Sequence, residues 1–318
     1  MSRTDPAAHS RAVEAALSSG AAARSPVAAS WSRSARLHGL APDRGRKPER
    51  MTAQELALAV QRMEPVVRAA GPSLDRLFQA VGGVGCCVLL ADRDGVPVDR
   101  RGASVDDRTF QDWGLWTGAL WDEAHEGTNG IGTALAEGRA VTIHGTDHFL
   151  ARNTLLSCMS APLYDAEGQL AGVVDVSSCR ADLTEGFAGL ISHAVTEAAR
   201  RIEADVFRLA FPRARIVLLP NAERHPGAAL AVDGDDLVIG ATRGARAMLG
   251  LSGDLMKSPR PAADLLGADA PETLEDAERA VLMRALARAG GNVSAAARGL
   301  GISRATFHRK IAAPRRHS

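Results

Sequence analysis

Hydrophobic residues follow the helical period in two long stretches, which flank a series of short continuous apolar runs. Between residues 187 and 206 the interval is three or four, which predicts one long helix with the face Phe187, Leu190, Ile191, Ala194, Val195, Ala198, Ile202 and Val206. Upstream, Thr52 and Glu55 form a capping box that opens a helix. We expect Pro65 to disturb that helix and Gly71-Pro72 to stop it, so that Ser73 opens another one.

The stretch between these helices has the pattern of β-structure. Residues 86–91 form an apolar run typical of a buried strand, and a turn over 92–95 leads to a partner strand at 96–99. Further strands are expected over residues 140–144, 155–163 and 169–177, and a turn-rich segment over 118–136 enters a helix. This order predicts an α+β fold, in which an antiparallel sheet is covered by helices on one side.

Residues 206–252 predict a smaller piece after the long helix. Residues 229–239 have the pattern of strand, turn and strand, and residues 242–249 that of a helix stopped by Gly250. The segment is similar to the opening of a PAS domain, but it is too short for a complete one. Two prolines in the next stretch, Pro259 and Pro261, favour loop and a flexible linker over residues 253–272.

The last stretch has the pattern of three short helices. The first is expected over residues 273–289, with the core face Leu274, Ala277, Val281, Leu282, Ala285 and Leu286. Ser294 is expected to cap the second helix, two glycines to end it, and Ser303 to cap a third helix over residues 304–311. The apolar side of this pair is Val293, Ala296, Leu300, Ile302, Phe307 and Ile311. This is the plan of a helix-turn-helix whose last helix enters a DNA major groove.

Charge favours the DNA interpretation. The whole chain is nearly neutral, with 38 Lys and Arg against 37 Asp and Glu, but residues 290–318 carry no carboxylate and the six basic residues Arg298, Arg304, Arg309, Lys310, Arg315 and Arg316. Such a local excess attracts phosphate. Arg315 and Arg316 are expected to contact the DNA backbone. The alternative is an alanine-rich helical hairpin with a solvated basic face.

The spacing in this stretch also resembles a known family. Gly-Asn-x-Ser-x-Ala-Ala over residues 291–297 and Leu-Gly-Ile-Ser-Arg-x-Thr-Phe-x-Arg-Lys over residues 300–310 resemble the Fis-type helix-turn-helix of bacterial regulators. This resemblance implies double-stranded DNA as the partner. It places the DNA-contacting positions at Ser303, Arg304, Thr306, His308, Arg309 and Lys310.

A second resemblance covers most of residues 26–205. Its motifs, in order, are Ser30-Trp-Ser-Arg-Ser34, Trp121-Asp-Glu123, Gly127-Thr-Asn-Gly-Ile-Gly-Thr133, Asp147-His-Phe149, Cys158-Met-Ser-Ala-Pro162 and Gly172-Val-Val-Asp-Val-Ser177. The series is similar to the sensor half of acetoin-catabolism-type regulators, and it implies a GAF-like fold that senses a small-molecule effector. The best-known members also carry an AAA+ ATPase. This chain has no P-loop sequence and no room for that domain, so ATPase activity is not expected.

Candidate chemistry in the sensor region is sparse. The glycine-rich run at 127–133 could bind phosphate, but a tight turn that seats a helix fits better, since no acidic partner follows at dinucleotide spacing. Histidines and cysteines have no zinc-like spacing, so neither metal nor cofactor is expected. Trp121, His148 and Cys158 are the candidate ligand-binding residues, with core packing as the alternative for each.

Composition and motifs together predict a regulator and not an enzyme. No apolar run is long enough to cross a bilayer, no signal-peptide core is present, and four cysteines lack paired spacing, so we expect a cytoplasmic protein with no membrane partner. The expected division is an N-terminal segment at 1–50, the GAF-like domain at 51–205, the partial PAS-like segment at 206–252, the linker at 253–272 and the DNA-binding domain at 273–318.

Three hypotheses follow for function. The first is a DNA-binding transcriptional regulator that acts as a homodimer, with RNA polymerase as a further partner. The second is an adaptor or antagonist that pairs with an ATPase-bearing relative. The third is an enzyme on the sensor scaffold, such as a thiol reductase that uses Cys158. No catalytic set supports the third hypothesis.

Overall fold

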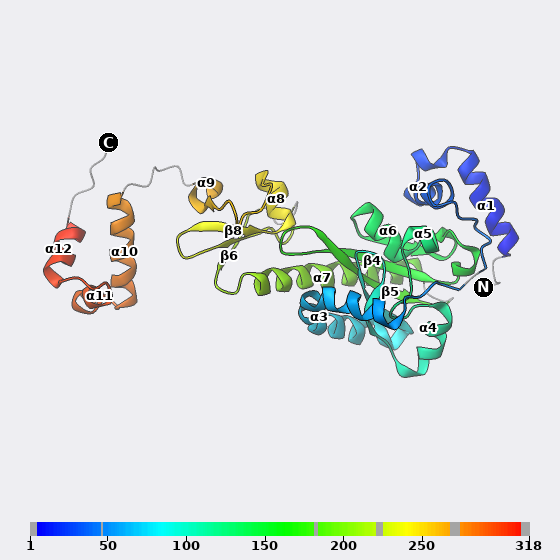
Figure 1. The fold of residues 1–318 in the computed structure, drawn as a ribbon, viewed down its shortest axis with the longest axis horizontal. Coiled ribbons are helices and arrows are strands. Elements are labelled where there is room, and N and C mark those ends of the chain that lie inside the picture. Colours follow the sequence, from blue (N-terminus) through cyan, green and yellow to red (C-terminus); the bar gives the residue numbers. More distant parts are fainter. Residues whose placement is uncertain (1–4, 46, 181–183, 221–224, 268–273, 313–318) are drawn as a thin grey trace. The chain divides into compact units, whose positions relative to one another are not determined.

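The computed structural model describes residues 5–45, 47–180, 184–220, 225–267 and 274–312, which belong to two compact units, Met1–Ala262 and Ala263–Ser318 (Figure 1). The first unit contains two antiparallel sheets with their helices. The described residues of the second unit contain most of the short helix Ala262–Leu266 and three further helices. Across the described part of the chain, every helix falls short of the combined length and apolarity that a bilayer span requires.

A five-stranded antiparallel sheet forms the centre of the first unit, in the order β2-β1-β5-β4-β3. Its strands are β1 Cys86–Asp92, β2 Pro97–Arg101, β3 Val141–His144, β4 Ser157–Tyr164 and β5 Leu170–Ser178. The β1–β2 turn is fixed by the Asp92 carboxylate, which accepts from the amides of Asp94 and Val96, both at 3.0 Å. The antiparallel sheet expected from the sequence is confirmed.

Two long helices, α3 Ala53–Val81 and α7 Glu185–Ala210, cover one face of this sheet and pack against each other (Figure 1). The capping box at Thr52 and Glu55 is confirmed. The expected break at Gly71-Pro72 is wrong, because α3 continues through both of its prolines. A proline inside a helix costs about 3 kcal/mol. Here the residues on either side of Pro72 belong to one buried face, and burial of each large apolar side chain returns about 1.5–3 kcal/mol.

The apolar face expected on α7 is partly wrong. Five of its members are buried against the sheet and α3, namely Ile191, Val195, Ala198, Ile202 and Val206. Phe187 and Leu190 are instead 38% and 68% exposed. They stand in the first two turns of α7, and the periodicity by itself does not say where the contact with the sheet begins.

The opposite face of the sheet is also covered, so the expectation of helices on one side only is wrong. Three short helices lie there, α4 Asp107–Trp113, α5 Glu123–Glu126 and α6 Gly130–Glu137. Together with the segments between them they enclose a second buried cluster that includes Phe110, Leu115, Trp121 and Ile131. Helices this short leave only a weak periodic signal, which is why the pattern missed this layer.

The N-terminal helices pack against the segment of residues 147–153. Helix α1 Pro6–Ser18 and helix α2 Pro26–Ser32 contribute to a small core in which Val13 and Leu40 meet Phe149 and Leu150. His9 contacts the carbonyl of Phe149 at 3.1 Å, and Trp31 donates to the carbonyl of Asp147 at 2.8 Å. Residues 5–40 are therefore hydrogen-bonded into the body of the first unit.

A second, four-stranded sheet follows α7 in the order β6-β7-β8-β9. Its elements are β6 Arg215–Leu218, β7 Ala229–Val232, β8 Leu237–Ala241, α8 Arg243–Leu249, β9 Arg260–Pro261 and α9 Ala262–Leu266. The described part of the linker expected over residues 253–272 thus contains a short strand and a short helix, and β9 pairs with β8. Both elements are too short to give a periodic pattern.

After α9, the described residues of the second unit form the three helices α10 Leu274–Arg288, α11 Val293–Gly299 and α12 Arg304–Ala312. Its core contains Leu282, Ala296, Ala297 and Phe307. The prediction that Leu274 and Val281 of α10 belong to the core is wrong, since their side chains are 92% and 42% exposed. The expected cap at Ser294 is also wrong, because Asn292 caps α11 by accepting from the amide of Ala295 at 3.0 Å. Thr273 lies outside the described residues.

Candidate functional site

Helix α12 presents one exposed polar face. Arg304, Ala305, His308 and Arg309 are exposed, whereas Phe307 is fully buried on the opposite side. Positions 304, 305, 308 and 309 share a helical face, because 304 and 308, and likewise 305 and 309, are four residues apart, and 305 and 308 are three apart. Within the described residues, the guanidinium of Arg304 forms neither a hydrogen bond nor an ion pair. The face therefore exposes the guanidiniums of Arg304 and Arg309 and the imidazole of His308, which suit an anionic surface.

The other three expected contact positions have partners inside the unit. The Ser303 hydroxyl caps α12 by accepting from the amide of Thr306 at 3.0 Å, and the two hydroxyls lie 2.8 Å apart. The ammonium of Lys310 forms an ion pair with Glu278 on α10. Both ends of that pair are partly exposed, so the pair is weak and its partner can be exchanged for phosphate. Arg315 and Arg316, the expected backbone contacts, lie outside the described residues.

Helix α12 is held in place by α10 as well as by its own core. The guanidinium of Arg279 donates to the carbonyl of Ile311 at 3.1 Å, which satisfies one of the orphan carbonyls at the end of α12. Ile311 also packs against the core of the unit. The exposed face is therefore carried by a helix that is held by a hydrogen bond to α10 and by the core of the unit.

The three residues expected to bind a ligand lie in the interior of the first unit. Trp121 is 1% exposed and donates its indole N–H to the carbonyl of Gly114 at 2.8 Å. His148 is fully buried, with Nδ1 3.0 Å from the carbonyl of Gly145 and Nε2 3.5 Å from the sulfur of Cys158. His148 and Cys158 are thus brought together, and Trp121 is held by a different partner.

Burial sets the protonation of the His148–Cys158 pair. It lowers the pKa of His148 to about 4 and raises the pKa of the Cys158 thiol well above its usual value. A neutral imidazole with a protonated Nδ1 donates to Gly145 and leaves Nε2 as acceptor for the thiol. A neutral thiol is a poor nucleophile, so the geometry disfavours redox or nucleophilic chemistry at Cys158.

Cys158 is therefore expected to resist alkylation in the folded protein. Iodoacetamide at about pH 8 should leave Cys158 unmodified for hours, because burial keeps the thiol protonated and out of contact with reagent. Peptide mass spectrometry measures the modification residue by residue. The unfolded chain in urea, with all four cysteines labelled rapidly, provides the positive control. Fast labelling of Cys158 without unfolding would support a reactive thiol instead.

A buried carboxylate lies beside this pair. Asp175 on β5 is fully buried, and it accepts from the hydroxyls of Ser160 at 2.5 Å and Ser177 at 2.6 Å. Burial raises the pKa of Asp175 to about 6, and the two hydroxyl donors oppose that rise. Gly130, the first residue of α6, lies so close that a Cβ there would be 2.3 Å from the Ser160 hydroxyl. The glycine-rich run at 127–133 thus seats α6 on a polar strip of the sheet.

A second buried polar network joins the N-terminal helices to α5 and α6. Glu123 is 5% exposed and accepts from Arg33 in a bidentate pair at 2.8 and 2.9 Å. The hydroxyls of Ser30 and Thr133 also donate to Glu123, at 2.6 and 3.0 Å. The motifs that contain Ser30 and Glu123 were used only for the family resemblance, so this network was not predicted from the sequence. One signal could have found this network. Arg33 and Glu123, a basic and an acidic residue, stand in two different motifs of the same family pattern, which suggests an ion pair between them.

A half-buried acid, Glu203, lies on α7 near the end of β4. One of its oxygens accepts from the amide of Tyr164 at 3.0 Å, and the guanidinium of Arg243 lies 4.1 Å from the centre of the Tyr164 ring. Burial raises the pKa of Glu203 to about 7 against the opposing effect of that hydrogen bond and of Arg243 and Arg200.

The raised pKa of Glu203 predicts a pH dependence of stability. Between about pH 4.5 and 7 the folded chain binds more protons here than the unfolded chain, so this group makes the free energy of unfolding fall as pH rises through that window. Glu203→Gln should flatten that slope and stabilise the protein above pH 7 by about 2 kcal/mol, after discounting for partial exposure. Urea unfolding at several pH values measures both effects. Parallel curves for the two proteins would contradict the assignment.

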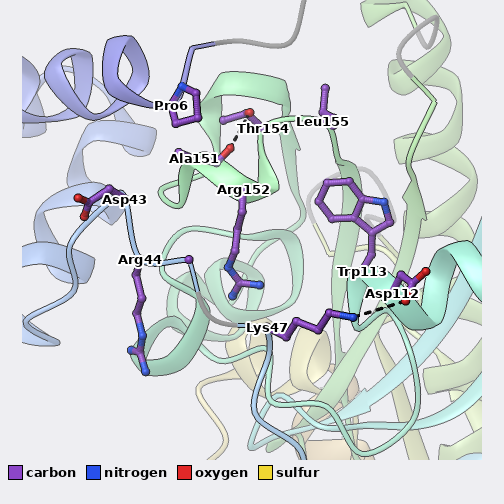
Figure 2. Close-up of a pocket in the computed structure, with 11 residues that line it drawn as sticks. Pro6, Asp43, Arg44, Lys47, Asp112, Trp113, Ala151, Arg152, Thr154 and Leu155 are labelled. Carbon is purple, nitrogen blue, oxygen red and sulfur yellow. Dashed lines mark hydrogen bonds and ion pairs between the residues drawn. The ribbon is translucent and has the colours of Figure 1, made fainter.

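An open cleft lies at the surface of the first unit, with a volume of about 710 Å³ (Figure 2). Its walls come from the start of α1, residues 43–45 and 47, the end of α4, and residues 151, 152, 154 and 155. Three cationic side chains, Arg44, Lys47 and Arg152, line it beside the indole of Trp113. None of the three expected ligand-binding residues lines this cleft. Among the described residues, no group of three or more His, Cys, Asp or Glu side chains is arranged to hold a metal ion.

Comparison with known proteins gives two family matches. The family described as MimR, N-terminal domain, matches residues 5–203, and the family described as bacterial regulatory protein, Fis family, matches residues 273–313. Both segments therefore agree with the resemblances found in the sequence.

Two curated relatives extend over most of this chain. The acetoin catabolism regulatory protein of Cupriavidus necator is 35% identical over 252 residues, which cover 78% of this chain and 37% of that protein. The propane 2-monooxygenase operon transcriptional activator MimR of Mycolicibacterium smegmatis is 32% identical over 240 residues, which cover 71% of this chain and 38% of that protein. The chain thus spans less than two fifths of the length of these relatives.

Among solved structures, the crystal structure of the E. coli DhaR(N)–DhaL complex contains a similar chain. The TM-score is 0.52 at 17% identity, over 71% of this chain and 76% of that chain. At this level of identity the likeness concerns the fold alone. It supports the GAF-like α+β fold expected for the sensor region, and the Fis-family match supports the helical C-terminal unit.

Proposed function

The chain belongs to the family of the MimR N-terminal domain, and we propose on that premise that it is a bacterial DNA-binding transcriptional regulator without enzymatic activity. In this proposal the first unit senses a small-molecule effector, and the helix-turn-helix binds a specific operator. The observation that carries the proposal is the exposed face of α12, where Arg304, His308 and Arg309 stand on a helix that matches the Fis family. Such a protein works in the cytoplasm, where the chromosome lies.

The DNA contacts divide into two kinds in this proposal. Arg304 reads a base, since arginine pairs bidentately with guanine in the major groove. Thr306, Arg309 and Lys310 contact phosphates, which position the helix without sequence choice. Ser303 and His308 complete the contact surface, and the sequence assigns them no separate role.

A homodimer fits this mode of binding. One short recognition helix reads only a few base pairs, so two copies on a near-palindromic site supply the missing specificity. Exposed apolar side chains on one face of α10 support self-association through this unit, since Leu274 and Val281, seven residues apart, are 92% and 42% exposed. RNA polymerase is the expected partner of the DNA-bound dimer.

Effector binding must favour one arrangement of the dimer over another. A ligand shifts an equilibrium only by its difference in affinity for the two states. Trp121, His148 and Cys158 stay predicted ligand contacts, reached if the packed interior opens to admit an effector. The names of the two relatives refer to acetoin catabolism and to a propane 2-monooxygenase operon. These names suggest a small catabolic substrate as the effector of this chain.

Selection from a random pool of duplex DNA tests this function. The full chain should enrich a near-palindromic sequence, and its affinity for that sequence should fall steeply as salt rises from about 50 to 200 mM, because counterions are released on binding. Enrichment of nothing, together with capture of an ATPase-bearing relative from cells, would favour the adaptor alternative and sink the proposal.

A further inference from the structure

Residues 104–113 form a thin layer over one part of the five-stranded sheet. The layer consists of the short turn Ser104–Asp106 and helix α4, and most of its side chains are exposed (Figure 1). Within this fully described stretch Phe110 is the one buried side chain, at 2% exposed. A segment that buries a single large side chain is weakly held, and such segments open locally while the rest of the fold stays intact.

Glycines stand at both ends of this segment. Gly102 follows β2, and Gly114 follows α4 with a φ of 75°. Beyond α4 the chain is fixed again, because the carbonyl of Gly114 accepts from the indole of Trp121 at 2.8 Å and the amide of Gly118 donates to the carbonyl of Pro97 at 2.9 Å. The last residues of α4 line the open cleft, so there is free space beside the segment. Small residues at two fixed ends suit a hinged segment.

A buried guanidinium joins the segment to the sheet. The Arg100 side chain on β2 is 10% exposed, and its Nη1 donates to the carboxylate of Asp107 at 2.8 Å. The guanidinium carbon lies 4.1 Å from the centre of the Trp116 ring and 5.4 Å from that of Phe110. Arg100 therefore contacts the segment at the first residue of α4 and at its buried ring.

The same guanidinium is poorly satisfied while the segment is closed. Its Nε and Nη2 are buried and have no hydrogen-bond partner among the described residues. Buried donors without acceptors cost free energy, and water would satisfy both of them if the segment moved away. Asp107 is 36% exposed, so water also competes for its side of the pair. Hydration of Arg100 thus favours opening, and the charge of Asp107 favours closure.

A thiol beneath the segment reports on its position. Cys87 on β1 is fully buried in the same cluster as Phe110. The register pairs Val88 with Arg101, so Cys87 stands beside the point where the chain leaves β2 for the segment. Its neighbour Cys86 belongs to the cluster on the other face of the sheet, under α3 and α7. Opening of the segment therefore exposes Cys87 alone, whereas unfolding of the unit exposes both cysteines.

We propose that residues 104–113 are a lid that opens over the sheet face carrying Cys87, held closed by Asp107 and released by hydration of Arg100. The proposal rests on the proposed sensing function and names the entrance through which a small molecule reaches the packed interior beside Trp121. Phe110 leaves with the lid, and the space it vacates is the first that an effector can occupy.

Thiol labelling of the full chain, without DNA or effector, measures this opening. Iodoacetamide at about pH 8 modifies thiols that solvent reaches, and fragment-ion mass spectrometry separates Cys86 from Cys87. In the wild type Cys87 should react at least about tenfold faster than Cys86, and at least about tenfold faster than Cys158, which lies against Gly130 of α6. Equal rates for the two neighbouring cysteines would show that the whole unit unfolds, and would overturn the proposal without any variant.

Two variants with opposite expected effects test the roles of the pair. Asp107→Asn leaves the buried guanidinium without a counter-charge, so Cys87 should react at least about tenfold faster than in the wild type. Arg100→Met keeps a side chain that packs on the two rings but has no N–H group to hydrate, so Cys87 should react at least about threefold more slowly. An arginine that merely supports the fold would instead give faster labelling in both variants.

Matched changes at neighbouring charges are the controls. Asp112→Asn breaks the exposed pair of the lid with Lys47, which are 3.4 Å apart. Arg101→Met changes the next arginine of β2, which pairs with Asp75 on α3. Both variants should label Cys87 within about twofold of the wild-type rate, since neither touches the buried guanidinium.

Two variant results would overturn the proposal, namely an unchanged rate at Cys87 in Asp107→Asn or a rate that Arg100→Met does not lower. Because these measurements contain neither DNA nor effector, their failure leaves the regulator proposal standing. Conversely, loss of DNA binding says nothing against the lid.

Discussion

Arg304→Ala is expected to weaken binding to the selected operator by about 5- to 150-fold, which corresponds to 1–3 kcal/mol, and to relax the base preference at one position of each half-site. The guanidinium stands exposed at the first position of α12 and has no competing partner among the described residues. Removal therefore takes away a contact with DNA and none within the protein. Titration of labelled duplexes with single-base changes measures both effects.

Arg309→Ala is the matched control for that change. Arg309 shares the exposed face of α12, but in our proposal it contacts phosphate. Its removal should weaken all duplexes about equally and reduce the slope of log affinity against log salt by about one. If Arg304→Ala bound the operator as tightly as the wild type, or if both variants lost affinity without loss of base preference, Arg304 would not be a base-reading residue.

Gly130→Ala is expected to destabilise the first unit by about 1–3 kcal/mol, or more if α6 has to move. The added methyl would lie 2.3 Å from the Ser160 hydroxyl, 2.6 Å from the Cβ of Cys158 and 2.9 Å from a carboxylate oxygen of Asp175. All three neighbours are buried, so none can swing away into solvent. The hydroxyl that holds Asp175 would be displaced, which leaves a buried acid with fewer donors.

A glycine on the surface of a helix provides the control. Gly189 on α7 has nothing within 4 Å of its Cβ position, so Gly189→Ala should be neutral or stabilise by about 0.5–1 kcal/mol through helix propensity. Urea unfolding followed by far-UV circular dichroism compares the two variants. Equal stability of Gly130→Ala and the wild type would mean that α6 is not seated on this polar strip.

The antiparallel sheet and helix α12 could be predicted from the sequence because both have strong local signals. Continuous apolar runs, turn residues and capping serines report directly on strands, hairpins and helix starts. The face of α12 followed for the same reason, since Phe307 and Ile311 mark its buried side and leave Arg304 and Arg309 outside.

Features that depend on distant contacts were missed. Helix α3 passes through Pro72 because the sheet buries residues on both sides of it, and no local rule contains that sheet. The pair of Arg33 and Glu123 joins segments 90 residues apart. The cleft around Arg152 likewise assembles four separate segments, none of which has a motif of its own.

Trp121 was expected to bind a ligand because of its residue type alone. Residue type does not distinguish a binding pocket from a packed core. A tryptophan fits both a pocket and a core, and only its contacts decide which. Here its indole N–H is satisfied by the carbonyl of Gly114, so the side chain has a structural role in the packed state. Trp113 has the more accessible position, on the wall of the cleft.

Site-specific photocrosslinking tests the central claim, which is that the exposed face of α12 lies against duplex DNA. A benzophenone amino acid replaces Ala305 in the middle of that face, and a second protein carries it in place of Leu190, which is 68% exposed on α7. Our account predicts that irradiation joins the Ala305 position to the selected duplex and leaves the Leu190 position unattached. Bound duplex that crosslinks from neither position, or from Leu190 alone, would contradict it.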